Sequence, residues 1–235
     1  MSDSRSVFIS SPIAALVEGI YHSTTTLRDL RKKGNMGIGT FNGLDGEMVY
    51  LDGKCFCLRP NMEAIEVEDD VMTPFAMCID FAEHMSEGID RQVAFDDFEH
   101  FMLDLIPSKN LLYAIRIEGT FDLIKFRSVP RQANYSPLAE IAKVQTVSSI
   151  ENVDATVMGF YTPSYLASVH MPGLHLHVIS KDRRHGGHLL GAAMRKVTVK
   201  LQQAQSVELG LPLTLDFLTY EQRRDVQADL DRVER

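Results

Sequence analysis

The spacing of apolar residues predicts one clear amphipathic helix over residues 94–106. Aromatic and aliphatic side chains recur there three or four positions apart, two aspartates fall in the first turn, and Pro107 follows the end. Shorter helices are predicted over residues 14–21, from 26 onward, over 137–142, and from 219 onward. Thr26 and Thr219 each begin a capping-box pattern, which is typical of a helix start.

Apolar runs and alternating patterns predict strands in the rest of the chain. The predicted strands cover residues 36–41, 47–51, 112–117, 121–126, 144–149, 155–161, 175–180 and 189–199. Two Asp-Gly pairs, at 45–46 and 52–53, indicate turns on either side of one strand. Glu47 shares a face of that strand with Val49 and Leu51, which indicates a partly buried carboxylate. An exposed glutamate at a strand end is the alternative.

Three histidines lie where two neighbouring strands would bring them together. Alternation along a strand places His175 and His177 on one face. The Gly186–Gly187 pair is predicted to turn the chain and bring His188 to the same place. Three imidazoles without a cysteine thiolate are typical of a catalytic zinc site, which keeps one coordination position open. His185 is the rival third ligand, but two neighbouring arginines disfavour a dication there.

The remaining histidines have no ligand-like neighbours in the sequence, so each is predicted to be a surface or core residue. They are His22, His84, His100 and His170.

Composition narrows the class of protein. The chain has 235 residues, of which 45% are hydrophobic and 24% charged, and this amount of apolar material predicts a globular core. The formal charge of -8 argues against a nucleic-acid partner. No secretory signal or membrane span is apparent, and three cysteines in apolar surroundings favour a reducing compartment, so a cytoplasmic location is expected. The three thiols are predicted to be buried and unpaired.

Several segments, in order along nearly the whole chain, resemble α-acetolactate decarboxylases. They are Thr40, residues 44–47, 116–121, 127–132 and 159–160, and the spacing of His175, His177 and His188. The resemblance implies an α/β fold of the α+β type with two domains. Residues 1–135 would form a mixed β-sheet with flanking helices, and residues 136–235 a mostly antiparallel, barrel-like sheet that carries the metal site.

The resemblance also implies an activity and the residues that perform it. The chain would convert 2-acetolactate to (R)-acetoin and CO₂ through a zinc-bound enediolate, in acetoin and butanediol biosynthesis, as a homodimer. His175, His177 and His188 would bind Zn²⁺, and the other active-site residues would be Glu47, Arg127 and Glu234, with Thr40 close by. For Glu234, near the end of the chain, a frayed and solvated side chain is the alternative.

Two other classes of protein use similar histidine patterns. A cupin-like metal oxygenase would need a glutamate four residues after His177, where this chain has Lys181. A zinc-stabilised binding module without enzymatic activity would unfold when the metal is removed.

Overall fold

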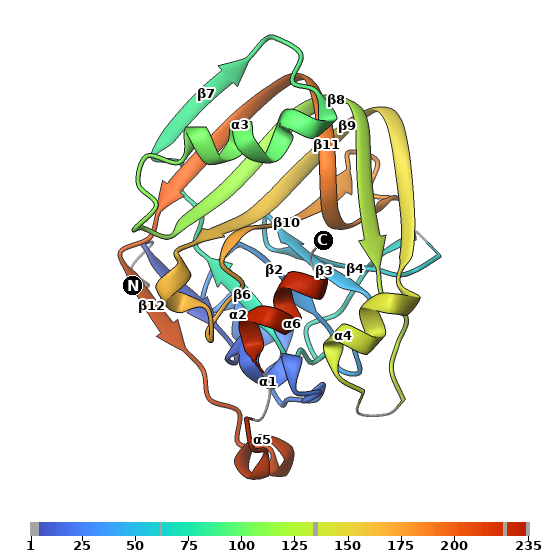
Figure 1. The fold of residues 1–235 in the computed structure, drawn as a ribbon, viewed down its shortest axis with the longest axis vertical. Coiled ribbons are helices and arrows are strands. Elements are labelled where there is room, and N and C mark those ends of the chain that lie inside the picture. Colours follow the sequence, from blue (N-terminus) through green and yellow to red (C-terminus); the bar gives the residue numbers. More distant parts are fainter. Residues whose placement is uncertain (1–4, 62, 134–135, 223–224, 234–235) are drawn as a thin grey trace.

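The computed structural model describes residues 5–61, 63–133, 136–222 and 225–233. Two β-sheets dominate it, one above the other in Figure 1, and short helices flank them. The fold is therefore of the mixed α+β type with few helices, as the resemblance implied. Among the described residues, no helix is long and apolar enough to cross a membrane.

The lower sheet in Figure 1 has seven strands and is mixed. Its order is β12 (Ser206–Leu209), β1 (Ser6–Ile9), β6 (Ala76–Ile79), β2 (Met36–Thr40), β3 (Glu47–Leu51), β4 (Lys54–Leu58) and β5 (Ala64–Glu66). β12 and β1 are parallel, and the other neighbours are antiparallel. Every residue of β2 and β3 is buried, because both faces of the sheet are covered. Leu27 and Leu30 of α2 (Leu27–Arg31) pack on one face, and the other face joins the larger core between the sheets.

The upper sheet is antiparallel and partly closed into a ring. Its order is β10 (Gly173–Ser180), β9 (Thr146–Thr162), β8 (Tyr113–Ser128), β11 (Gly186–Gln203) and β7 (Met85–Ile89). β10 also pairs with β11, and this pairing closes a ring of four strands. The helix predicted over 94–106 is confirmed as a 3-10 turn, Phe95–Asp97, followed by α3 (Phe98–Leu105). Phe98 and Met102 of α3 are buried in the core of this sheet.

The strands of the upper sheet are longer than the sequence pattern predicts. The strands predicted over 112–117 and 121–126 form one strand, β8, which begins at residue 113. Those predicted over 144–149 and 155–161 form another, β9, which begins at residue 146. Gly119, which lies between the two predicted strands, has φ +150° and continues the pairing of β8 with β11 at Val197. A glycine in this conformation bends a strand without ending it, because it has no side chain to clash.

The sheets do not divide the chain at residue 135. β7 and β8 precede that residue but belong to the upper sheet, whereas β12 follows it but belongs to the lower sheet. The division into domains 1–135 and 136–235 stays a prediction.

Short helices gather beside the lower sheet. α1 (Ile13–Val17), α4 (Leu138–Ile141) and α6 (Val226–Val233) contact one another, and α5 (Leu215–Thr219) lies at the lower end beyond β12. Two further 3-10 turns cover Ala142–Val144 and Ser164–Leu166.

The capping box at Thr26 is confirmed, since its hydroxyl accepts from Asp29 N and the Asp29 side chain accepts from Thr26 N. The capping box predicted at Thr219 is wrong. Thr219 is the last residue of α5, which Thr214 caps, and α6 begins only at Val226, where Asp225 accepts from Ala228 N.

Candidate active site

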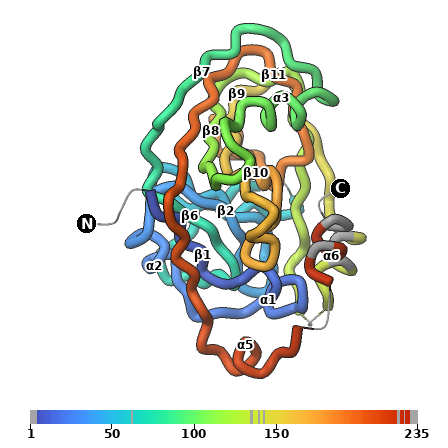
Figure 2. Tube along the Cα trace, turned by 60° about the vertical axis from the view of Figure 1, so that its left-hand side comes forward, coloured from blue at the N-terminus to red at the C-terminus, as the bar shows by residue number. Residues whose placement is uncertain are grey.

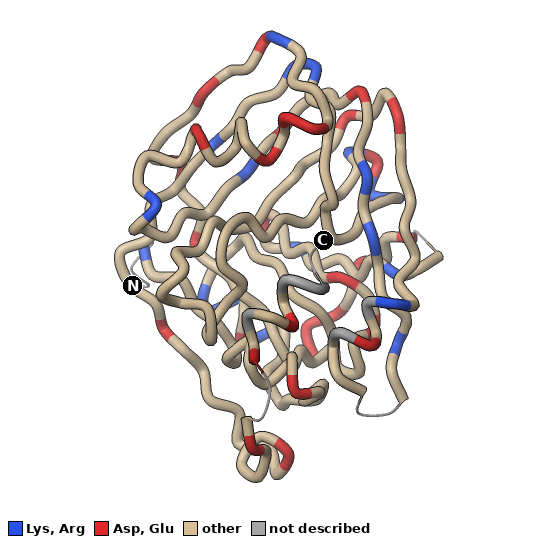
Figure 3. The backbone as a smooth tube through the Cα atoms, viewed as in Figure 1, with Lys and Arg blue, Asp and Glu red and all other residues tan. Residues whose placement is uncertain are grey.

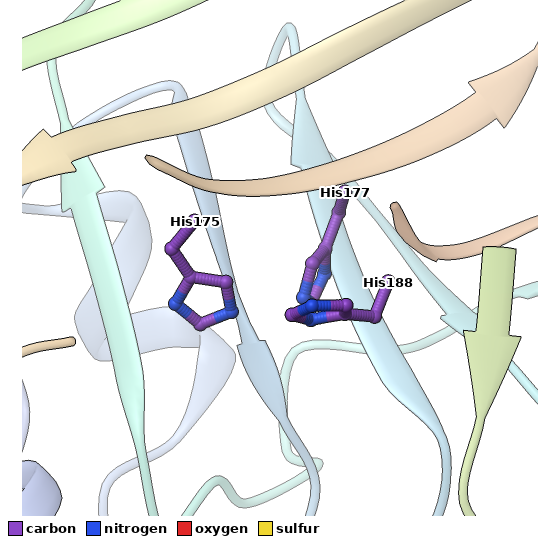
Figure 4. A group of neighbouring side chains, drawn as sticks. All are labelled: His175, His177 and His188. Carbon is purple, nitrogen blue, oxygen red and sulfur yellow. The ribbon is translucent and has the colours of Figure 1, made fainter. Parts of the chain in front are cut away.

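Three buried histidines meet on the face of the ring that is turned toward the lower sheet. His177 on β10 lies directly opposite His188 on β11, and His175 is two residues before His177 on the same face. One nitrogen from each ring can be chosen so that all three lie within 4.8 Å of one another. Figure 4 shows the three rings gathered below the strands that carry them. The structure thus brings together the three ligands predicted from the sequence.

The turn that brings His188 into place differs from the prediction. The chain turns at residues 181–185, where Ser180 N donates to His185 O at 2.8 Å and Arg183 has φ +60°. The two glycines predicted as the turn instead begin β11. A Cβ at Gly187 would lie 2.4 Å from the carbonyl oxygen of Arg127, so this position needs glycine for close strand approach. His185 is exposed in the turn and lies outside the histidine group.

The ring of His177 is oriented by the lower sheet. Its Nδ1 lies 2.7 Å from the carbonyl oxygen of Met48 on β3. A carbonyl oxygen only accepts, so Nδ1 carries the hydrogen and Nε2 keeps the lone pair that a metal requires. Three buried imidazoles, one of them in this tautomer, are a donor set that fits a divalent transition metal.

Glu47, Thr40 and Arg127 lie around the histidines and are all buried. Glu47 begins β3, and one of its carboxylate oxygens is 3.6 Å from Nε2 of His177. Of the two interpretations of Glu47, a partly buried carboxylate and an exposed strand end, the structure supports the first, because the side chain is buried. Thr40, opposite Glu47 on β2, donates its hydroxyl to Gly46 O at 2.7 Å. Arg127 on β8 is directly opposite His188, so the two side chains leave adjacent strands at the same level.

These six residues line one pocket between the two sheets. Its empty space is about 540 Å³, including the open mouth. The rest of the lining is mainly apolar and includes Ile13 of α1, Leu138 of α4 and Leu230 of α6. Figure 3 shows Lys, Arg, Asp and Glu positions spread over the strands, helices and loops of the whole chain. A small substrate bound here would meet a few charged groups within apolar walls, an arrangement in which electrostatic interactions are strong.

Glu234, the seventh predicted site residue, lies outside the described residues. The structure does place Leu230, which lies on α6 four positions earlier in the sequence, in the wall of the pocket.

His170 belongs to the surroundings of the site, although the sequence indicated no such neighbours. Its Nε2 lies 3.2 Å from Nδ1 of His175, and it is fully buried. The segment between β9 and β10 folds back to place it there. No spacing rule links residues 170 and 175, so only the tertiary structure reveals the contact.

The cysteines are structural, as predicted. Cys55, Cys57 and Cys78 are buried and unpaired. Burial raises the pKa of the Cys57 thiol to about 12 and that of the Cys78 thiol to about 12, because a thiolate is poorly solvated there. The thiols are therefore protonated at neutral pH and are poor metal ligands.

Comparison with known proteins gives a consistent result in sequence and in fold. A family model described as "Alpha-acetolactate decarboxylase" matches residues 7–223. The alpha-acetolactate decarboxylase of Methanosarcina mazei is 38% identical over 226 residues, covering 96% of this chain and 78% of that protein. The one from Bacillus subtilis is 36% identical over 212 residues, covering 90% of this chain and 83% of that protein.

Solved structures show the same similarity. The crystal structure of alpha-acetolactate decarboxylase from Bacillus subtilis strain 168 has a TM-score of 0.94 and 35% identity, covering 97% of this chain and 99% of that one. A Staphylococcus aureus protein described as of unknown function and similar to alpha-acetolactate decarboxylase has a TM-score of 0.90 and 27% identity. The alignment with this protein covers 97% of the present chain and 98% of the Staphylococcus aureus chain.

Proposed function

The chain belongs to the α-acetolactate decarboxylase family, whose activity is the removal of CO₂ from acetolactate, and on that premise we propose that it converts 2-acetolactate to (R)-acetoin with bound zinc. The proposal includes a role for this reaction in acetoin and butanediol biosynthesis. The observation that carries it is the convergence of three buried histidines, Glu47 and Arg127 in one pocket.

The three histidines would hold the metal. His175, His177 and His188 provide neutral nitrogen donors, which suit zinc, and no cysteine joins them. Bound zinc would supply a Lewis acid that polarises the ketone β to the carboxylate, so that this carbonyl can take up the electron pair that CO₂ leaves behind.

Arg127 supplies a fixed positive charge beside the place where negative charge develops. Breaking the bond to the carboxylate leaves an electron pair that moves into the neighbouring carbonyl and forms an enediolate. The guanidinium of Arg127 is always protonated and is buried in the pocket wall. We propose that it orients the substrate carboxylate and then stabilises the enediolate more strongly, since only the second effect lowers the barrier.

A carboxyl group must then protonate one face of the enediolate carbon, and this step sets the chirality of acetoin. We propose Glu47 for it, because its carboxylate lies 3.6 Å from Nε2 of His177 and is fixed at the start of a buried strand. Glu234 is the second candidate, on the grounds of family resemblance. Thr40 lines the pocket, and its oxygen can accept a hydrogen bond from a substrate hydroxyl while its proton is directed to Gly46 O.

We also propose a homodimer and a cytoplasmic location. The exposed edge strand β12 and the leucines that follow it support pairing with a second copy of the chain. The unpaired thiols support a reducing compartment.

The test combines metal analysis of the purified chain with measurement of CO₂ release from 2-acetolactate. We expect one zinc per chain and formation of (R)-acetoin. Each of His175→Ala, His177→Ala and His188→Ala should keep a folded circular dichroism spectrum and lose both metal and activity. His185→Ala is the matched control and should keep both, because this histidine is exposed in the turn. Full zinc content in the His188 variant would contradict the ligand assignment.

A further inference from the structure

We propose that His170 is a positioning residue that holds His175 in the tautomer whose Nε2 lone pair binds the metal. This inference rests on the proposed metal site and extends it to a residue outside the ligand set. From the sequence pattern, His170 is predicted to be only a surface or core residue.

The hydrogen-bond partners of His170 determine where its own proton lies. Its Nδ1 lies 3.0 Å from the carbonyl oxygen of Met171 and 2.8 Å from the hydroxyl oxygen of Thr162. The carbonyl can only accept, so Nδ1 must carry the hydrogen. In the neutral ring, Nε2 is then the nitrogen with the lone pair, and it is an acceptor.

The position of the proton on His170 determines in turn which nitrogen of His175 carries a hydrogen. Nε2 of His170 lies 3.2 Å from Nδ1 of His175. Because that Nε2 accepts, Nδ1 of His175 must donate, and the lone pair of His175 lies on its Nε2. One backbone carbonyl, at Met171, thereby selects the tautomer of His170 and, through it, the tautomer of His175. His177 reaches the same state directly, through the carbonyl of Met48.

His170 is held firmly enough to act in this way. Its side chain is completely buried, stacked on Phe75 at 5.9 Å between ring centroids and edge-on to Phe160 at 6.3 Å. Its backbone nitrogen donates to Leu166 O at 3.0 Å, which ties it to the 3-10 turn after β9. A ring packed in this way cannot rotate without opening the core, so its acceptor stays directed at His175.

The partner of His175 is a side chain, so the interaction can be removed and restored by substitution. His170→Phe keeps an aromatic ring between Phe75 and Phe160 but removes the Nε2 that lies against Nδ1 of His175. His170→Gln places an amide oxygen near the position of the lost Nε2 and can accept the same hydrogen bond. His100→Phe is the control, because the side chain of His100 is 83% exposed on α3.

The first measurement is the zinc dissociation constant of the full chain, by competition with a chromophoric chelator. We expect His170→Phe to weaken zinc binding about 10- to 100-fold, the usual effect of removing a partner behind a metal-bound histidine. His170→Gln should recover most of this loss, and His100→Phe should bind as the wild type does. Unchanged affinity in His170→Phe, or an equal loss in the Phe and Gln variants, would overturn the proposal.

The second measurement does not depend on any variant folding. Nitrogen-15 spectra of the histidines in the wild-type chain, with and without zinc, report which ring nitrogen carries the hydrogen. We expect a protonated Nδ1 on His175 in both states and zinc on its Nε2. An unprotonated Nδ1 on His175 would contradict the role of His170 and leave the metal site intact. A wild-type chain that binds no zinc would contradict the metal site itself.

Discussion

Glu47 is held in place by the backbone on both sides. It pairs with Thr40 on β2 and with Leu58 on β4, and its carboxylate lies 3.6 Å from His177 Nε2. A side chain fixed in this way can deliver a proton to one face of an intermediate, which a mobile side chain cannot do reliably.

Glu47→Gln tests that role at the scale of a single residue. Glutamine keeps the volume and loses the acidic proton, so we expect zinc to stay bound while decarboxylation slows by about 10²- to 10⁴-fold. Chiral chromatography of the acetoin should show loss of stereochemical purity. Glu66→Gln, on the exposed edge strand β5, is the control and should behave as the wild type. A wild-type rate with pure (R)-acetoin from the Glu47 variant would remove this residue from the protonation step.

Some residues of the site could be predicted from local sequence, and others could not. The shared face of His175 and His177 follows from strand alternation, and the burial of Glu47 follows from the apolar strand around it. The role of Arg127 was suggested only by family resemblance. His170 was missed because its contact with His175 depends on how an irregular segment folds back, and apolar periodicity contains no information about this.

At the scale of elements, glycines were the main source of wrong predictions. A glycine pair between two apolar runs normally indicates a turn, yet Gly186 and Gly187 lie in β11. Both accommodate the close approach of a neighbouring strand, since a Cβ at Gly186 would lie 2.1 Å from Val178 O. The turn itself is built from Ser180, whose hydroxyl oxygen accepts from the backbone nitrogens of Arg184 and His185. Sequence alone does not distinguish these two uses of glycine.

Gly159 provides a test of close strand packing behind the histidines. It pairs with Leu176 on β10, has φ +154°, and a Cβ there would lie 2.1 Å from the carbonyl oxygen of His175. Gly159→Ala should therefore displace β10 at His175. We expect a loss of about 1–3 kcal/mol in the free energy of unfolding, measured with denaturant, and weaker zinc binding.

The control for this variant is Gly88→Ala on β7. A Cβ there meets nothing within 4 Å, so stability and zinc affinity should stay close to wild type. Equal behaviour of the two alanine variants would show that β9 and β10 can separate without disturbing the histidines.

At the scale of the whole molecule, the site lies where the two sheets meet. Thr40 and Glu47 come from the lower sheet, and Arg127 and the three histidines come from the upper one. Strand patterns predicted most of the strands, but not how β3 meets β10 or how β2 meets β9, because such contacts join residues more than a hundred positions apart. The contact of His177 Nδ1 with Met48 O is one of them. Only the family resemblance linked these residues in advance.

Removal of the metal should abolish the decarboxylase activity without unfolding the chain. The cores of the two sheets consist of aliphatic, aromatic and sulfur-containing side chains and do not include the three histidines. Such burial supplies most of the stability of a domain of this size. After treatment with a chelator, we expect an unchanged far-ultraviolet circular dichroism spectrum and a cooperative thermal transition, with activity restored by zinc. Unfolding on chelation would instead favour a structural role for the metal.

The outer edge of the lower sheet is where we expect a second copy of the chain to bind. Among the described strands, β12 pairs with β1 alone, and all four of its residues are exposed. Apolar side chains continue along the exposed chain beyond it, with Leu213 at 82% and Leu218 at 65% exposure. A strip of exposed apolar side chains beside an open strand edge is typical of an association surface, and a twofold axis would let two identical strips cover each other.

Light scattering after gel filtration tests this arrangement directly. The wild type should have twice the chain mass of 26.4 kDa, and a double variant, Leu213→Glu with Leu218→Glu, should shift toward the monomer. Glutamate is expected to act here because burying two charges against their symmetry copies is unfavourable. Val144→Glu is the control, since Val144 is also exposed but lies next to α4, away from the strip. A monomeric wild type would contradict the dimer. A double variant that stays dimeric would show that the dimer interface lies on another surface.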